Sequence, residues 1–456
     1  MLSAIIKQIH ASGGHCFYVG GYVRDALLGL PWAAHDKDIE IFGLSREQVF
    51  SILSTYGKVH EVGKAYSIFK LRGHPEWDFS VAQSPELTYR EACLRRDFTI
   101  NAVMQDVASG RIVDPLHGRE DIKQGIIRHT NPEVFKADPL RAYRAVQLAA
   151  RFNFTIDPAA MDLIKSTDLS KLDQERIFFE LRKLLLSAHP SLGLRYMLQC
   201  GILEQMHPML YALAGCKQEE SHHPEGDTFN HTLLVVDRCT QFLQHSRNPQ
   251  ALMMAALLHD IGKPVTSGFH KGKITTYGHD VKGSQMAASF LQELRAPQRL
   301  IAEVRLLIKE HMQPVLLYKQ RERVSDKAIR RLLSRVNVGE LLLLSEADYL
   351  GRGIERDYDP IKTWLIGRIE QLGLNLEGGI TPLVRGRDLI EMGLEPGRDF
   401  ALLLQEAFEL QIEGMNKNEI IEALRLRTAA PGQQMFTGDN PSKHSEPDKW
   451  SRDQGV

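Results

Sequence analysis

The chain has 456 residues, of which 43% are hydrophobic and 25% are charged, and its formal net charge at pH 7 is -1. This length exceeds what one hydrophobic core normally serves, so two to four domains are expected. The near-neutral charge excludes binding of nucleic acid through an overall positive chain, and any RNA must be held by local basic patches.

The cysteines and the N-terminal sequence indicate a cytoplasmic protein. The five cysteines are scattered without a CxxC pair, which favours reduced thiols and argues against a structural zinc site. The first residues lack the apolar core of a signal peptide, and no later run is long enough for a membrane-spanning helix.

The first part of the chain predicts a small mixed α/β unit. Its β-type runs are short and alternate between polar and apolar residues, as expected of strands with one buried face. In the last of these runs, Asp78 falls on the face opposite Trp77 and Phe79. The predicted elements are strands at residues 17–19, 38–42, 67–71 and 77–81, and a helix at 23–28.

After residue 131 the strand signals fade and helical periodicity takes over. In residues 138–152 the apolar side chains share one broad helical face, with Arg141 and Arg144 on or beside the other face. The pattern predicts an α+β chain, with a mixed α/β head followed by helical domains. Helices are predicted at residues 138–152, 176–186, 232–243, 252–259, 298–311, 326–333 and 338–344.

Three motifs in the first part supply what a site for a nucleoside triphosphate and magnesium needs. They are Gly-Gly-Tyr-Val-Arg-Asp at 20–25, Asp-Lys-Asp at 36–38 and Arg-Arg-Asp-Phe-Thr-Ile-Asn-Ala at 95–102. In nucleotidyl transfer one metal activates the attacking hydroxyl and a second holds the triphosphate. Hard divalent cations prefer carboxylate oxygens.

The catalytic candidates follow from that chemistry. Asp36 and Asp38 point the same way on a strand, about 7 Å apart, so both reach one metal cluster, and Asp78 is a third candidate ligand. The turn at Gly21 lets backbone N–H groups approach the phosphates, and Arg24 in the first helical turn suits bidentate phosphate binding. Each motif alone is commonly a turn or a cap, but the three in this order favour a nucleotide site.

In this order the motifs resemble the class II tRNA nucleotidyltransferases, or CCA-adding enzymes, and their poly(A) polymerase relatives. The resemblance implies a polymerase-β-like head that uses Mg²⁺, and it extends through residues 138–144 into a helical neck. It also implies that Asp138 and Arg141 pair with the base of CTP or ATP, with Arg96 and Arg144 as further nucleotide contacts. A carboxylate accepts from the exocyclic amine that cytosine and adenine share.

Two positions depart from the family pattern. The family often has Glu where this chain has Ala137, and Arg where this chain has Gln147. Glutamine adds no charge for a phosphate contact. A specialised CC-adding or A-adding enzyme therefore stays open beside full CCA addition.

A second set of residues has the order and spacing of an HD phosphohydrolase. Histidines and carboxylates on different helices can converge on a divalent ion that activates water. A lone histidine on an apolar helix is usually a core residue, but an adjacent His-Asp pair before Gly-Lys-Pro is more specific. The predicted metal ligands are His231, His259, Asp260 and Asp348, and the predicted phosphate contacts are Lys263, His279 and His311.

These residues resemble the HD domains of bacterial CCA enzymes. That resemblance implies hydrolysis of 2′,3′-cyclic phosphates, 2′-nucleotides and phosphomonoesters with Ni²⁺, Mn²⁺ or Mg²⁺. An HD scaffold kept only for tRNA docking is the competing interpretation. The expected partners are the tRNA 3′ end, CTP and ATP. No association with a membrane is expected, and the protein is expected to be a monomer or a homodimer. The expected domains are a head at 1–130, a neck at 131–215, an HD domain at 216–350, a helical segment at 351–427 and a disordered tail at 428–456.

Three other functions remain as alternatives. A poly(A) polymerase usually carries a basic C-terminal extension, whereas this chain has an HD region and a near-neutral end. An alarmone synthetase–hydrolase also joins the two activities, but its HD part precedes the transferase. An inactive RNA-binding protein is disfavoured by the intact Asp36, Asp38, Arg24, His259 and Asp260.

Overall fold

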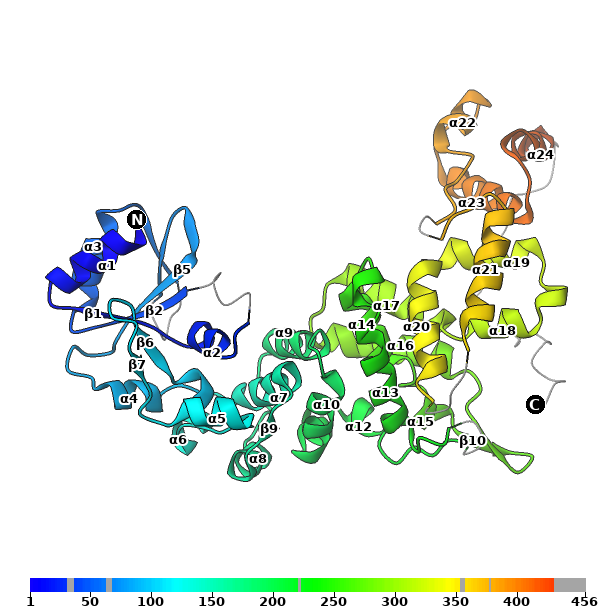
Figure 1. Cartoon of the computed structure of the whole chain (residues 1–456). Helices are drawn as coiled ribbons and strands as arrows, with labels where there is room; N and C mark the ends of the chain where they lie inside the picture. Colours follow the sequence, from blue (N-terminus) through cyan, green and yellow to red (C-terminus); the bar gives the residue numbers. More distant parts are fainter. Residues whose placement is uncertain (31–36, 63–67, 220–222, 353–356, 377–378, 430–456) are drawn as a thin grey trace. The chain divides into compact units, whose positions relative to one another are not determined.

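The computed structural model describes residues 1–30, 37–62, 68–219, 223–352, 357–376 and 379–429 (Figure 1). Asp36 therefore lies outside the described residues, as do the first position of the strand predicted at 67–71 and the chain from residue 430 onward. The chain divides into two compact units, Met1–Gln320 with Val336–Gly367, and Arg321–Arg335 with Arg368–Val456.

The head contains a seven-stranded mixed sheet in the order β3-β4-β5-β2-β1-β6-β7. Strands β2 and β5 are parallel, and the other neighbouring pairs are antiparallel. The strands are β1 (His15–Tyr18), β2 (Lys37–Phe42), β3 (Val59–Val62), β4 (Ile68–Leu71), β5 (His74–Val81), β6 (Met104–Asp106) and β7 (Ile112–Val113).

The two faces of this sheet have different roles. Ile39, Ile41 and Phe79 belong to an apolar cluster with α1 (Leu2–Ala11) and α3 (Arg46–Ser54), which cover one face. The alternate positions of β2 and β5 therefore point to the opposite face. At its end, that face packs against α4 (Tyr89–Leu94), and α2 (Gly21–Leu27) follows β1.

Side-chain caps fix where two of the head helices begin. Ser45 and Gln48 form a capping box at the start of α3, and Thr88 and Glu91 form another at the start of α4. Each box satisfies backbone N–H groups that the first helical turn leaves without partners.

The neck is built around α7, whose residues 145–150 are all buried. An α-helix buried on several faces needs neighbours on each, and α9 and α10 pack against it. The elements from the end of the head through the neck are η2 (Thr99–Asn101), α5 (Gly118–Gln124), β8 (Ile126–Ile127), α6 (Pro132–Ala137), α7 (Arg141–Phe152), β9 (Thr155–Ile156), α8 (Pro158–Lys165), α9 (Gln174–Leu185), α10 (Pro190–Gln199), α11 (Ile202–Met206) and α12 (Pro208–Tyr211).

Beyond the neck, the helices form a bundle around α14, in which residues 251–258 are all buried. Helices α13, α17 and α20 pack against α14, so its apolar surface is covered on all sides. The elements are α13 (Thr228–Thr240), η3 (Leu243–His245), α14 (Pro249–Leu258), α15 (Lys263–Thr266), β10 (Gly268–His270), β11 (Lys273–Thr275), α16 (His279–Glu293), α17 (Gln298–Glu310), α18 (Gln313–Lys319) and α20 (Val338–Leu350).

The second unit has a small apolar core of its own. Val384, Leu389, Leu403 and Ile420 belong to its buried cluster. Lys327 of α19 pairs with Glu413 of α23 at 2.6 Å. The elements are η4 (Arg321–Arg323), α19 (Asp326–Arg335), the end of α21 (Asp359–Gln371), α22 (Gly386–Glu391), α23 (Arg398–Glu413) and α24 (Lys417–Ala429).

The predicted fold class is confirmed: a mixed-sheet head precedes helical regions. The predicted helices at 176–186, 252–259 and 338–344 correspond to α9, α14 and α20. Thr428 and Ala429, assigned to the tail, instead complete α24. None of the described helices has the length and apolarity required to cross a membrane.

One buried histidine of the neck predicts a pH dependence. His207 is 3% exposed, and its Nε2 lies 2.9 Å from the hydroxyl oxygen of Tyr143 on α7. Burial lowers the pKa of His207 to about 4. Unfolding exposes the imidazole, and its pKa returns to about 6.5.

We expect the native state to lose stability as pH falls from about 6.5 towards 4, because only the unfolded chain then gains a proton at His207. The contribution is on the order of 3 kcal/mol at the acid end. His207→Gln keeps a polar partner for Tyr143 and should flatten this part of the curve of thermal unfolding midpoint against pH. The exposed His270→Gln is the control, and an identical slope in both variants would contradict the assignment.

Candidate functional site

The turn at Gly20 brings the three head motifs together. Gly20 precedes α2 with φ +67°, in the left-handed region that favours glycine. A Cβ atom at this position would lie 3.3 Å from Asp38 Oδ2 and 3.6 Å from Arg96 Nη1. Gly21 is the first residue of α2. The glycine turn, the aspartate motif and the double arginine therefore share one location, as the sequence predicted for a nucleotide site.

Three carboxylates lie on the sheet face that faces away from α1 and α3. The parallel register of β2 and β5 pairs Asp38 with Asp78, and Glu40 follows two residues after Asp38 on the same face. Arg96 binds Glu40 at 2.5 Å, and Lys70 binds Asp78 at 2.5 Å. Oxygen donors on adjacent strands suit a hard divalent cation. Glu40 was not among the residues predicted from the sequence, although the alternation along β2 already placed it beside Asp38.

Arg24 is buried within the head instead of lining an open surface. Only 5% of Arg24 is exposed. Its Nε donates to Asp25 at 2.7 Å, its Nη1 donates to Asn101 at 2.6 Å, and the guanidinium lies 4.6 Å from the ring centre of Phe152 on α7. Burial lowers the pKa of Arg24, and Asp25 opposes that effect. In this structure Arg24 connects the glycine motif to the motif at 95–102.

Asp97 and Asp25 connect the same motifs to α7. Arg144 Nη2 lies 2.6 Å from Asp97, and Arg151 Nη2 lies 2.8 Å from Asp25. Asn101 Nδ2 also donates to Asp97 at 2.9 Å. Burial raises the pKa of Asp97, but Arg144 and the hydrogen bonds outweigh burial and leave the pKa below its usual value. Arg144, which stays a predicted nucleotide contact, thus also links the head to the neck.

The predicted base-reading pair lies where α6 meets α7. Asp138 caps the end of α6 and pairs with Arg176 of α9 at 3.3 Å. Arg141 begins α7 and donates to the backbone carbonyl oxygens of Val134 and, at 3.4 Å, of Arg95. Arg141 therefore contacts the double-arginine motif directly.

Gln147, one of the two departures from the family pattern, does not face the solvent. It lies within α7 and is 6% exposed. Gln147 is thus part of the packed interior of the neck and not of an exposed face.

The second site is a row of histidines in the helical bundle, each with one ring nitrogen bonded to the backbone. The Nδ1 atoms of His259, His279 and His311 lie 2.9, 2.8 and 2.6 Å from backbone carbonyl oxygens three residues earlier. A carbonyl oxygen only accepts, so each Nδ1 carries the proton and each Nε2 keeps a lone pair. Such backbone partners are the usual way of orienting metal-binding histidines.

We call His231, His259, Asp260, His279, His311 and Asp348 the HD cluster, and all six are buried. Its ligand atoms form two groups, each within 4.8 Å: His231, His259 and Asp348, and Asp260, His279 and His311. The Asp260 carboxylate lies 3.1 Å from His259 Nε2 and 3.5 Å from His279 Nε2, so it adjoins both groups. Imidazole and carboxylate donors in this number fit one or two divalent metal ions. The structure therefore brings together all four predicted ligands and all three predicted phosphate contacts, since Lys263 also contacts Asp260.

The carboxylates of the HD cluster are held ionised. Burial raises the pKa of Asp260, but His259 and Lys263 outweigh burial and hold the pKa well below its usual value. Asp348 behaves in the same way, with Arg352 and His231 as the opposing groups. Lys263, the third predicted phosphate contact, lies 2.7 Å from Asp260 and donates to Gln218 at 2.6 Å. Ionised carboxylates are the form that binds metal.

A carboxylate that the sequence analysis missed orients His231. Glu225 Oε1 lies 2.8 Å from Nδ1 of His231 and 2.8 Å from Nδ1 of His223. Burial opposes ionisation of Glu225, yet the two histidines lower its pKa to about 2. The sequence signal was weak, because Glu225 and His223 precede α13 in a loop. The only signal for their role was that they lie close to His231 along the chain.

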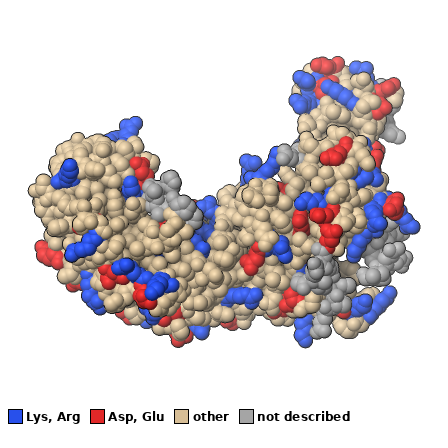
Figure 2. All heavy atoms as spheres, in the orientation of Figure 1, with Lys and Arg blue, Asp and Glu red and all other residues tan. Residues whose placement is uncertain are grey.

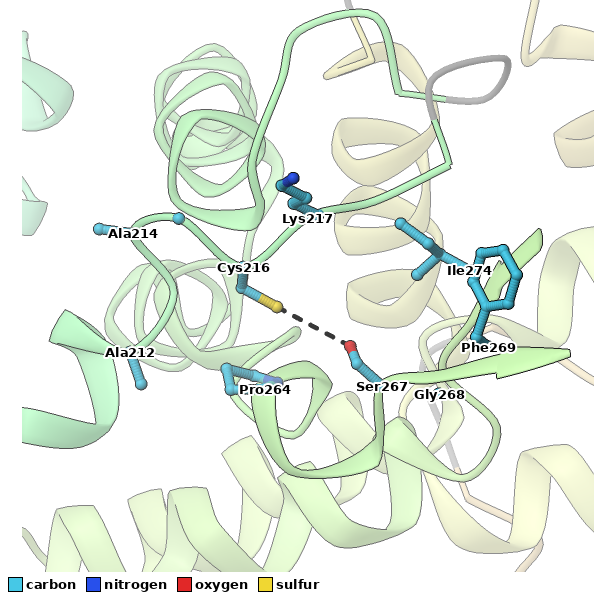
Figure 3. Close-up of a pocket in the computed structure, with 10 residues that line it drawn as sticks. Ala212, Ala214, Cys216, Lys217, Pro264, Ser267, Gly268, Phe269 and Ile274 are labelled. Atoms are coloured by element: carbon cyan, nitrogen blue, oxygen red, sulfur yellow. Dashed lines mark hydrogen bonds between the residues drawn. The ribbon is translucent and has the colours of Figure 1, made fainter. Parts of the chain in front are cut away.

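A pocket of about 460 Å³ adjoins α15, which begins at Lys263 (Figure 3). Figure 3 shows Cys216 and Ser267 facing each other across it, and their Sγ and Oγ atoms are 3.9 Å apart. Phe269 and Ile274 of the β10–β11 hairpin form another wall, and Phe269 is 78% exposed. The pocket thus presents an aromatic ring and small polar groups beside the segment that carries Gln218.

Charged side chains of both signs are scattered over the face of the molecule drawn in Figure 2. On the face drawn in Figure 2, Lys and Arg are interspersed with Asp and Glu. This agrees with the net charge of -1.

Three families match successive parts of the chain. Residues 16–128 match the family described as "Poly A polymerase head domain", residues 153–213 match "Probable RNA and SrmB- binding site of polymerase A", and residues 228–353 match "HD domain". The first contains the carboxylate face of the sheet, and the last contains all of the HD cluster.

Solved structures share the fold. The CCA-adding enzyme of Bacillus stearothermophilus, in complex with CTP, is 22% identical with a TM-score of 0.63 and covers 93% of this chain and 97% of its own. The Thermotoga maritima CCA-adding enzyme, complexed with tRNA, is 20% identical with a TM-score of 0.58 and covers 93% and 94%.

Curated relatives are more similar in sequence. The Multifunctional CCA protein of Actinobacillus pleuropneumoniae serotype 5b (strain L20) is 34% identical over 303 residues, which are 61% of this chain and 71% of the relative. The protein of the same name from Mannheimia succiniciproducens is 30% identical over 382 residues, which are 76% of this chain and 87% of the relative. The chain therefore belongs to the multifunctional CCA proteins, the CCA-adding tRNA nucleotidyltransferases that carry an HD domain.

Proposed function

We propose that this enzyme builds and repairs the 3′-CCA end of tRNA with both CTP and ATP, and that its HD domain hydrolyses phosphate esters at a separate site. The observation that carries the first activity is the meeting of Gly20, Asp38 and Arg96 at one location. The two groups of ligand atoms in the HD cluster support the second. A cytoplasmic location is part of this proposal, because tRNA and nucleoside triphosphates are the proposed substrates of the enzyme.

In the head, Asp36, Asp38 and Asp78 are proposed to hold Mg²⁺. When bound, the metal supplies charge for the triphosphate and lowers the pKa of the attacking tRNA hydroxyl. The backbone at Gly21 and the Arg96 side chain bind phosphate oxygens. Glu40 holds Arg96 in place until nucleotide arrives, since the two groups are 2.5 Å apart.

Base selection is assigned to Asp138 and Arg141. The Asp138 carboxylate accepts from the exocyclic amine of cytosine or adenine, and the Arg141 guanidinium donates to ring or carbonyl acceptors. The pairing of Asp138 with Arg176 orients the carboxylate, although the carboxylate is 38% exposed. Arg24 and Arg144 keep this pair in place relative to the metal-binding carboxylates, through Asn101 and Asp97.

In the HD domain, His231, His259, Asp260 and Asp348 are proposed to bind a divalent ion such as Ni²⁺, Mn²⁺ or Mg²⁺, with His279 and His311 available for a second. When bound, the metal supplies an activated water for attack on phosphorus. Lys263 neutralises the phosphate oxygens. The proposed substrates are 2′,3′-cyclic phosphates, 2′-nucleotides and phosphomonoesters, which suits an enzyme that prepares damaged tRNA ends for repair.

Replacing Asp38 by Asn should reduce incorporation of labelled CMP and AMP into tRNA that lacks CCA by about a thousandfold, because metal-ion catalysis supplies several kcal/mol. CTP and ATP are assayed separately, so that the same experiment tests full CCA addition. Asp162→Asn changes a carboxylate that is 78% exposed on α8, and it should retain activity. Wild-type rates in the Asp38 variant would refute the proposed metal site.

The variant Asp138→Ala should lower kcat/KM for CTP and ATP about 10- to 100-fold, because each base contact contributes about 1–3 kcal/mol of discrimination. Discrimination against UTP should narrow at the same time, since uracil lacks the amine that the carboxylate recognises. Steady-state incorporation of each nucleotide measures both effects, with Asp162→Ala as the control. A uniform loss for CTP, ATP and UTP would assign Asp138 to folding only.

For the HD domain, Asp260→Asn should abolish hydrolysis of a 2′,3′-cyclic nucleotide and weaken Mn²⁺ or Ni²⁺ binding in titration calorimetry. The change removes one anion that adjoins both groups of ligands. CCA addition by the same preparation should remain at the wild-type rate. Loss of both activities in a folded protein would argue against two independent sites.

A further inference from the structure

Arg352 reaches the HD cluster from the end of α20. Its Nη2 lies 3.5 Å from Oδ1 of Asp348, one helical turn earlier, and its side chain is 21% exposed. The Nε atom is buried and has no hydrogen-bond partner among the residues that the structure describes. A buried guanidinium N–H without a partner costs free energy, so it points to a missing acceptor.

The preceding glycine fixes the position of Arg352. A Cβ atom at Gly351 would lie 2.8 Å from Val235 Cγ2 and 3.3 Å from the backbone nitrogen of Val235. Val235 belongs to α13, the helix that also carries His231. The end of α20 is therefore pressed against α13 at a point where only glycine fits, and Arg352 is held beside the HD cluster.

Arg352 and Lys263 flank the cluster in the same manner. Lys263 lies 2.7 Å from Asp260, and Arg352 lies 3.5 Å from Asp348. Asp260 and Asp348 are also proposed ligands of the divalent ion. Once an ion shares them, each cation has charge and N–H donors left for another anion.

The charge of the linked groups fits a phosphate. Asp260, Asp348 and Glu225 are joined through His231 to two cations, Lys263 and Arg352. Their side chains carry one net negative charge while the imidazoles are neutral, and one divalent ion reverses that sign. With the ion bound, the net positive charge of the cluster attracts a phosphate dianion. Without the ion, the cluster holds no excess of buried positive charge.

We propose that Arg352 is the phosphate-binding arginine of the HD site, acting opposite Lys263. Its Nε and a terminal nitrogen form the planar fork that binds two oxygens of one phosphoryl group. The ligand class is a terminal or cyclic phosphate ester, with inorganic phosphate as the product. This inference rests on the proposed phosphohydrolase activity and adds the residue that recognises the phosphoryl group.

The test compares Arg352→Met and Arg352→Lys in the full-length, Mn²⁺-loaded protein. Charged hydrogen bonds contribute about 1.5–3 kcal/mol, so the Met variant should raise KM for p-nitrophenyl phosphate and Ki for inorganic phosphate about 10- to 100-fold. The Lys variant keeps the positive charge but lacks the planar fork, so its KM and Ki should lie between those of the wild type and the Met variant. Arg299→Met, on an exposed part of α17, is the matched control.

Calorimetric titration with Mn²⁺ separates phosphate binding from support of Asp348. The proposal expects Mn²⁺ affinity to stay at or above the wild-type value in both variants, with CCA addition unchanged. Weaker Mn²⁺ binding with unchanged KM and Ki would overturn it and leave Arg352 as a support for Asp348. If the wild-type protein binds Mn²⁺ and hydrolyses no phosphate ester, the proposed HD activity itself fails and this inference falls with it.

Discussion

The buried polar network between the head and α7 is the interaction on which the nucleotide site depends. Asp97 forms an ion pair with Arg144 and accepts a hydrogen bond from Asn101. Asn101 in turn accepts a hydrogen bond from Arg24. These side chains join the glycine motif, the double-arginine motif and the helix that carries Arg141. Buried charges of this kind are costly unless every partner is present, so removing one member unbalances the others. The spacing between the carboxylates proposed to bind metal and the residues proposed to read the base is thereby set by packed side chains.

The HD cluster also holds buried ionised carboxylates, in this case within a helical bundle. Asp260 and Asp348 are ionised although they are buried, because imidazoles and two cations surround them. In both sites the protein thus neutralises its carboxylates internally. When a metal or nucleotide binds, a protein group exchanges its internal partner for the ligand. This exchange costs less free energy than binding in a cavity that holds unpaired buried charges.

Local periodicity in the sequence predicted much of the two sites, whereas features that depend on distant contacts were missed. Alternation along β2 and β5 placed Asp38 and Asp78 on one face, and the His259-Asp260 pair located the HD cluster. The burial of Arg24 was missed, because it depends on Phe152, which is far away in the chain. Arg352 was missed for a related reason, since its role requires α20 to pack on α13 at Gly351. Asp36, predicted with equal weight, lies outside the described residues.

The histidines that end helices carry a further consequence. His259 caps α14 and His311 caps α17, and each binds through Nδ1 a carbonyl of the helix that it ends. The same hydrogen bond orients each ring so that its Nε2 is left for the HD cluster. A cation held by His231, His259 and Asp348 would tie together α13, α14 and α20 and stabilise the folded chain by mass action. Heat tolerance of the bundle would then depend on the cation supply of the cell.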